Sequence, residues 1–255
     1  MEDKSRDTSN SSSERVARER AFHNELFAAD NLRPQGDFYT ALQNCFQLYR
    51  QLVDEKSAGA RVLEYGCARG DRALELAPTA RHIAGIDISE VAINLAAKRA
   101  KDLSCDNTDF GVMDAENLTF PDNSFEFVFG SGIIHHLNIE RAFSEISRVI
   151  QPGGEAIFVE PLGHNPLINW YRKKTPEART PDEHPLRKQD IELAGNFFSK
   201  VNLTFYGLTT IGSSFINNTT AKDILYQTFR PIDRILLSLP VIKWHAWYVL
   251  IRLAR

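Results

Sequence analysis

Apolar positions follow two alternating patterns between residues 61 and 160. Short apolar runs bounded by turn residues predict strands at 61–65, 82–88, 108–113, 125–130 and 155–160. Between them, helical spacing predicts helices at 71–77, 89–102 and 138–150, the second opened by Ser89 as N-cap. Strands that alternate with helices in this way are typical of an α/β protein, in which helices cover both faces of a mostly parallel sheet.

The segments that flank this core follow other patterns. Residues 1–13 are Ser, Asp, Asn and charged residues with little to bury, which predicts a disordered tail. Residues 14–57 show helical spacing on either side of a break at 31–36, and we interpret them as an N-terminal helical cap. The remainder, 58–255, is predicted to be the main domain.

Beyond residue 160 the pattern is less regular. A polar, proline-rich stretch predicts an insertion at about 161–198. A strand at 200–210, an amphipathic helix at 220–238 and a last strand at 247–253 are expected to complete the main domain.

Composition adds few constraints. The chain has 255 residues, of which 43% are hydrophobic and 25% charged, and its net charge is -3. This balance gives no general reason to bind nucleic acid. The three cysteines are far apart, so neither a disulfide framework nor a metal site is predicted. The polar start and the lack of a long apolar run predict a cytoplasmic protein.

Candidate chemistry gathers where the predicted strands end. A turn through Gly66 and Gly70 follows the first strand, where a backbone without Cβ atoms lets a ligand approach closely. Asp87 ends the second strand, about 20 residues further on, where a carboxylate suits two ribose hydroxyls. Asp114 follows the third strand and could accept a hydrogen bond from an adenine amine.

The order of these motifs resembles that of the class I S-adenosylmethionine-dependent methyltransferases, including the quinone-biosynthesis C-methyltransferases. The resemblance covers about residues 60–160. It implies a Rossmann-like sheet of seven strands with an antiparallel last strand, and S-adenosylmethionine as cofactor. It places Glu64, Gly66 and Gly70 around the methionine part, Asp87 at the ribose and Asp114 at the adenine. Further cofactor contacts are expected from neighbours in the same motifs: Cys67, Ala68, Ile88, Ala115 and Ser131.

Ala68 stands where this family usually has glycine, so a slightly different loop path is expected. The same residue argues against a dinucleotide-binding domain. The dinucleotide fingerprint, Gly-x-Gly-x-x-Gly, would need glycine at Ala68 and at Asp71. A nucleic-acid methyltransferase is disfavoured because Ser131-Gly-Ile-Ile stands where an Asn-Pro-Pro-aromatic motif would be expected. A catalytically inactive partner protein stays an alternative, although it would have no need of Asp87 and Asp114.

The predicted reaction is in-line transfer of a methyl group to O, C or N of a small-molecule acceptor. His164, His135 and Glu160 are the candidate catalytic residues, because they lie at or just after the ends of the fourth and fifth strands. For His135 and its neighbour His136, packing beside the cofactor is the alternative. His164 lies in a polar loop, where functional residues often concentrate.

Residues 221–255 combine six Lys or Arg with two acidic residues and contain Trp244, Trp247 and Tyr248. Basic, aromatic and amphipathic character together suit a peripheral contact with a membrane, or a lipid-like acceptor. The alternative is a helix packed on the sheet, followed by the last strand.

Overall fold

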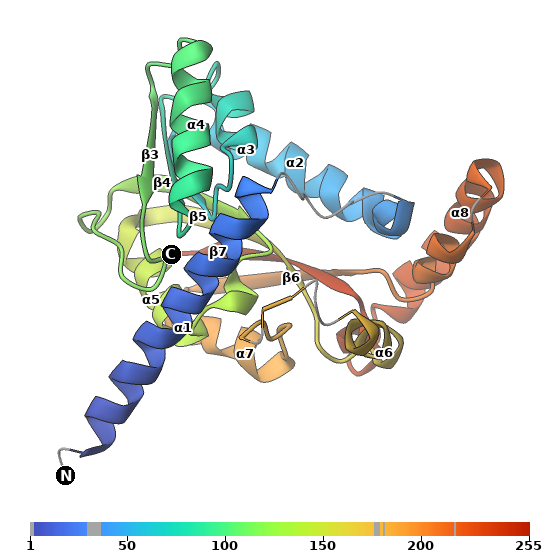
Figure 1. The fold of residues 1–255 in the computed structure, drawn as a ribbon. Helices are drawn as coiled ribbons and strands as arrows, with labels where there is room; N and C mark the ends of the chain where they lie inside the picture. The colour runs from blue at the N-terminus through green and yellow to red at the C-terminus, as the bar shows by residue number, and fades with distance from the viewer. Residues whose placement is uncertain (1–2, 30–36, 176–178, 181, 217) are drawn as a thin grey trace.

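The protein is an α/β structure built on one seven-stranded sheet (Figure 1). This computed structural model describes residues 3–29, 37–175, 179–180, 182–216 and 218–255. The strands are β1 (Arg61–Tyr65), β2 (His82–Asp87), β3 (Thr108–Val112), β4 (Phe125–Ser131), β5 (Ile150–Pro161), β6 (Lys200–Tyr206) and β7 (Tyr248–Ala254).

Their order in the sheet is β3-β2-β1-β4-β5-β7-β6. Strands β1 to β5 pair in parallel, and β7 runs antiparallel to both of its neighbours, β5 and β6. The predicted Rossmann-like sheet with an antiparallel last strand is therefore confirmed. In this order, the carboxyl ends of β1, β2 and β4 meet at the crevice where parallel α/β sheets bind their ligands.

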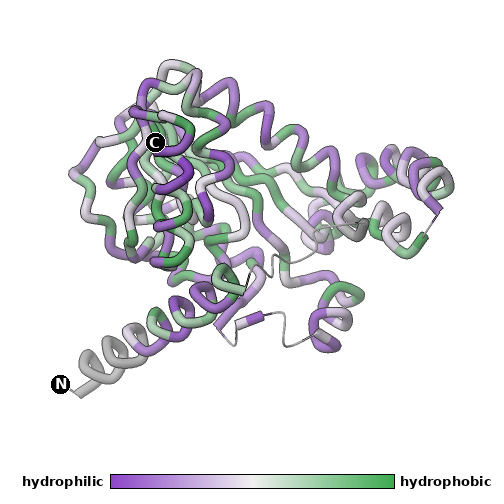
Figure 2. Tube along the Cα trace, turned by 45° about the horizontal axis from the view of Figure 1, so that its top comes forward, coloured by the Kyte–Doolittle hydropathy of each residue, from purple (hydrophilic) through white to green (hydrophobic). Residues whose placement is uncertain are grey.

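Helices cover both faces of the sheet because successive strand residues point to opposite sides. On one side, α2 (Gln43–Ser57) and α3 (Asp71–Leu76) lie over a core that includes Val62. On the other, α5 (Ile139–Val149) packs over a core that includes Leu63. Helix α4 (Glu90–Asp102) contacts β2 and β3. The central strands are mostly coloured hydrophobic in Figure 2, as burial on both faces requires.

The N-terminal segment differs from its prediction. Helix α1 begins at Asp3 and ends at Ala28, so it includes most of the tail predicted to be disordered over residues 1–13. The sequence contains no Pro or Gly before Pro34, so nothing breaks the helix that the buried positions further along α1 establish. The predicted break at 31–36 lies outside the described residues. A short 3-10 helix, η1 (Asp37–Leu42), precedes α2.

In the predicted insertion at about 161–198, the residues that the structure describes form three helical segments. They are α6 (Pro166–Lys174), α7 (Lys188–Glu192) and the 3-10 helix η4 (Leu193–Asn196). The division into a cap over 14–57 and a main domain over 58–255 stays a prediction.

The C-terminal segment divides into an outer and an inner part. Helix α8 (Thr219–Leu236) follows the 3-10 helix η5 (Thr210–Phe215) and projects from the body in Figure 1. The 3-10 helix η6 (Ile242–His245) leads into β7, where Val249, Leu250 and Ile251 are fully buried. Of the residues considered for membrane contact, those in β7 are therefore packed inside the sheet.

Candidate cofactor site

The loop after β1 turns through three residues with positive φ: Gly66 (+78°), Ala68 (+47°) and Gly70 (+70°). At Gly70 a Cβ atom would lie 2.8 Å from the Phe110 ring, so only glycine fits there. Ala68 adopts the left-handed conformation at a small steric cost. The loop therefore forms with alanine where the resembling family usually has glycine.

Asp87 connects this loop to the end of β2. One carboxylate oxygen accepts a hydrogen bond from the Ala68 backbone N–H (2.9 Å) and the other from the Ser89 N–H (2.9 Å). Ser89 caps α4, as predicted, by accepting from the Ala92 N–H. Burial raises the pKa of Asp87, and the backbone hydrogen bonds oppose that shift. The carboxylate is thus held in a fixed orientation beside the glycine loop.

Asp114 follows β3 and shapes the next turn. Its carboxylate accepts from the Glu116 N–H (2.9 Å). The Tyr65 hydroxyl, from the end of β1, donates to the carbonyl of Ala115. These bonds hold the end of β3 against the end of β1.

The loop, Asp87 and Asp114 line one cavity of about 180 Å³. Seven of the ten predicted cofactor residues line it: Gly66, Ala68, Asp87, Ile88, Asp114, Ala115 and Ser131. Glu64, Cys67 and Gly70 do not. Cys67 is buried, and its backbone N–H donates to Ile86 O. These three residues belong to the loop or lie next to it and stabilise its conformation without facing the cavity.

Glu64 is a buried carboxylate whose oxygen accepts from the Ala73 N–H (2.9 Å) in the first turn of α3. Burial raises its pKa to about 8, although the hydrogen bond from Ala73 and the charge of Arg72 oppose the shift. A positively charged ligand group nearby would favour the ionised form.

Helix α1 supplies the residues that sequence reasoning missed. Arg15, Val16, Glu19, His23 and Phe27 all line the cavity. The helix is held in place by Asn24, whose side-chain oxygen accepts from the Ser89 hydroxyl (2.7 Å). Arg69 donates to the Phe27 carbonyl (3.2 Å) and lies over its ring. The one available signal was the spacing of Glu19 and His23, which puts both on one helix face.

The 3-10 helix η2 (Ile134–His136) follows β4 and closes the cavity from the other side. His136 lines it, whereas His135 does not. His135 Nδ1 contacts Glu160 Oε2 (2.7 Å), and Glu160 Oε1 accepts from the backbone N–H groups of Ile133 and Ile134. Burial lowers the pKa of His135, and its contact with Glu160 opposes that shift. Glu160 is fully buried and occupied by these contacts.

His164 is also outside the lining of this cavity. Its Nε2 accepts from the Lys188 N–H (3.1 Å), and its ring lies near Trp244. Of the three predicted catalytic residues, none lines the cavity. Their catalytic roles stay predictions.

A larger cavity of about 800 Å³ lies between α2, β6 and α8. It shares no lining residue with the cofactor cavity and is formed at the edge of the sheet that ends with β6. This larger cavity is therefore separate from the cavity at the glycine loop.

The glycine loop, Asp87 and Asp114 thus lie around one cavity of about 180 Å³ near the carboxyl ends of β1, β2 and β3 in an α/β fold. Residues 62–154 match the family model described as "Methyltransferase domain". Over these residues the chain is similar to the class I S-adenosylmethionine-dependent methyltransferases, and solved structures with the same fold hold S-adenosylhomocysteine or S-adenosylmethionine.

Individual relatives and solved structures show the same similarity in sequence or in fold. A ubiquinone/menaquinone biosynthesis C-methyltransferase of Methylobacterium nodulans is 35% identical over 104 residues, which are 39% of this chain and 41% of that protein. A phosphoethanolamine N-methyltransferase of Haemonchus contortus, solved with S-adenosylhomocysteine, has a TM-score of 0.60 at 18% identity and covers 82% of this chain and 52% of its own. The [4+2]-cyclase SpnF has a TM-score of 0.57 at 22% identity, covering 81% and 79%.

The match spans less than half the length of the first curated relatives. The two structural similarities, both below 25% identity, show the fold alone. No helix within the described part of the chain is both long and apolar enough to span a membrane.

Proposed function

We propose that this protein transfers the methyl group of S-adenosylmethionine to a small-molecule acceptor. The observation that carries the proposal is the contact of Asp87 with the Ala68 N–H inside a cavity that Asp114 also lines. Asp87 would accept from the ribose hydroxyls, and Asp114 from the adenine amine. The carboxylates around the cavity suit a cofactor that carries a sulfonium and an ammonium group.

The chain's role in such a transfer is alignment within a site that excludes water. A nucleophilic atom of the acceptor attacks the methyl carbon, the bond to sulfur breaks, and its electron pair stays on sulfur to give S-adenosylhomocysteine. A proton released from the acceptor needs a base. His135, Glu160 and His164 do not line the cavity, so we assign none of them to that position.

Cofactor binding alone would not establish methyl transfer, because one protein with this fold is a cyclase. The test has two stages. S-adenosylhomocysteine at about 100 times its dissociation constant should stabilise the protein by about 2.7 kcal/mol. Label from methyl-labelled S-adenosylmethionine should then appear on a member of a panel of phenols, quinols, hydroxy acids and amines. Failure to bind the cofactor would refute the proposal; binding without transfer to any acceptor class would favour an inactive, methyltransferase-like protein.

Contact with an anionic membrane is the second candidate, and the surface of α8 favours it. Ile224, Ile232 and Ile235 are exposed, at 64%, 41% and 69%, and lie at helical spacing. Arg230 and Arg234 are exposed on the same helix. An apolar face flanked by arginines suits anionic lipid headgroups.

We expect the full-length protein to sediment with phosphatidylserine-containing vesicles, and Ile232→Glu/Ile235→Glu to weaken this binding at least ~10-fold. Thr219→Glu, which is exposed on the other side of the same helix, is the control for added charge alone. Equal recovery of wild type and double variant in the supernatant would refute the membrane proposal. The acceptor would then be a freely diffusing molecule.

A further inference from the structure

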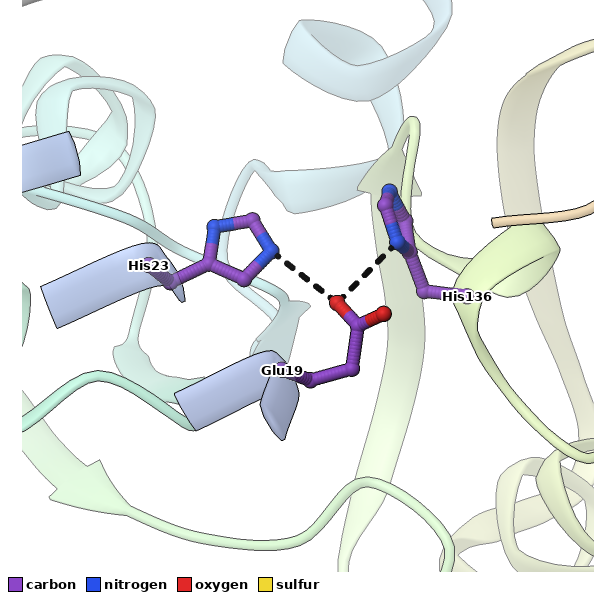
Figure 3. Close-up of side chains that lie close together, drawn as sticks. All are labelled: Glu19, His23 and His136. Atoms are coloured by element: carbon purple, nitrogen blue, oxygen red, sulfur yellow. Dashed lines mark ion pairs between the residues drawn. The ribbon is translucent and has the colours of Figure 1, made fainter. Parts of the chain in front are cut away.

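Three side chains that line the cofactor cavity converge on one point. Glu19 and His23 come from adjacent turns of α1, and His136 comes from η2 (Figure 3). Glu19 Oε2 lies 3.5 Å from His23 Nε2 and 3.3 Å from His136 Nδ1. The three ligand-type atoms all lie within 4.8 Å of one another. Two imidazoles and one carboxylate are a common set of ligands for a divalent transition-metal ion.

The polar atoms at the centre of this cluster are weakly paired. Within the described residues, Glu19 Oε2 and His136 Nδ1 are buried and make no hydrogen bond of normal geometry, and their contacts are the ion pairs of the cluster itself, at 3.3 and 3.5 Å. Buried polar atoms are nearly always hydrogen-bonded, so this arrangement needs an explanation. The two separations from Glu19 also fit an ion, because ligand atoms bound about 2.0–2.1 Å from a tetrahedral Zn²⁺ lie roughly 3.3–3.4 Å apart. A single cation between the three side chains would bind both buried atoms.

The surroundings hold the cluster ready for a cation. The other oxygen of Glu19 accepts from the Thr180 hydroxyl, which fixes the carboxylate. Arg15, which also lines the cavity, is paired with Glu116, which offsets its charge.

We propose that Glu19, His23 and His136 form a binding site for a divalent transition-metal ion such as Zn²⁺. Three protein ligands leave at least one coordination position, and all three residues line the cofactor cavity, so this position faces the space beside the cofactor. This inference rests on the proposed function. It implies that the methyl acceptor presents an oxygen atom, which the metal ion would bind. This site was not predicted from the sequence, where the scattered cysteines suggested no metal.

A second cluster competes for one of the ligands. His135, His136 and Glu183 also lie within ligand distance of one another. However, His135 Nδ1 is already engaged by Glu160, and its Nε2 is 3.7 Å from Glu183. In the Glu19 cluster the carboxylate is closer to its imidazoles, at 3.3 and 3.5 Å, and neither imidazole is engaged by Glu160. Glu183→Gln therefore separates the two possibilities.

The test uses the full-length protein, stripped with a chelator and titrated with Zn²⁺ and then Co²⁺. We expect one equivalent of Zn²⁺ to bind, and Co²⁺ to give the intense visible bands of a tetrahedral or five-coordinate site. Loss of an outer partner of a metal ligand already costs 10–100-fold in affinity, so Glu19→Gln and His23→Ala should each cost at least ~100-fold. Glu183→Gln should leave binding unchanged. His82→Ala, which removes an imidazole paired with exposed Asp109, is the matched control.

Melting temperatures of all variants check that they fold. Absence of stoichiometric binding in wild type, or unchanged binding in both Glu19→Gln and His23→Ala, would overturn the metal site. Loss of binding in Glu183→Gln alone would move it to the other cluster and overturn this assignment. S-adenosylhomocysteine binding is measured separately on the stripped protein, so its failure refutes the proposed function independently of the metal.

Discussion

Replacing Asp87 with alanine is expected to abolish the thermal stabilisation that S-adenosylhomocysteine gives to the wild-type protein. Hydrogen bonds to a charged group contribute roughly 1.5–3 kcal/mol each, so losing both ribose contacts should reduce cofactor affinity by roughly 100-fold or more. The loss is compounded because Ala68 and Ser89 would lose the acceptor for their N–H groups. The loop would then no longer be fixed to the end of β2.

The measurement is the melting temperature with and without S-adenosylhomocysteine at a fixed concentration. A gain of about 2.7 kcal/mol in wild type corresponds to a rise of roughly 5–11 °C for a chain of this size. Asp87→Asn keeps one carbonyl oxygen and should give an intermediate rise. Asp109→Asn is the control, because that side chain is 81% exposed on the neighbouring strand. A full rise in Asp87→Ala would show that the cofactor does not use this carboxylate.

The part of the site that sequence predicts well is the part built from strand ends. Gly66, Asp87 and Asp114 each lie at or within two residues of the end of a strand, and parallel strands bring their carboxyl ends to one edge. Residues that stand at the ends of successive strands in the sequence therefore lie close together around the cavity. The same logic located Ser89, because an N-cap is defined by its immediate neighbours.

Sequence reasoning failed where proximity depends on long-range packing. Glu19 and His23 reach His136 only because α1 folds back over the cavity, a contact between residues more than a hundred positions apart. No local pattern encodes where an N-terminal helix docks. The Arg69 contact with Phe27 and the Asn24 contact with Ser89 contribute to that docking, and both link α1 to motifs that were recognised for a different reason.

The candidate bases show the same limit. His135 and His136 are neighbours in sequence, yet one faces Glu160 in the core and the other faces the cavity. Which of two adjacent histidines points to the ligand depends on the path of η2. Glu160 was a candidate because of its place at the end of β5, and its burial gives it a different role. Its carboxylate holds the backbone of the segment that carries His136.

Replacing Glu160 with alanine is therefore expected to destabilise the whole protein. Three donors, two of them in buried bonds, would lose their acceptor: the N–H groups of Ile133 and Ile134 and the ring of His135. Each unsatisfied buried group costs about 1–3 kcal/mol, so the melting temperature should fall by at least ~6 °C. Glu155→Ala, on the same strand, removes a more exposed carboxylate paired with Lys56 and should cost less than about 1 kcal/mol.

Glu160→Gln distinguishes this structural role from catalysis. One oxygen of Glu160 accepts from both backbone N–H groups, at 2.9 and 3.0 Å, and the other contacts the imidazole of His135. A glutamine can keep the first two bonds with its carbonyl oxygen and donate to His135 through its amide, provided that the imidazole takes the other tautomer. Stability and cofactor binding should therefore return to near the wild-type values. A base could not be replaced in this way, since an amide does not accept a proton at neutral pH. A stable Glu160→Gln protein that binds S-adenosylhomocysteine normally but no longer transfers a methyl group would return Glu160 to the catalytic machinery.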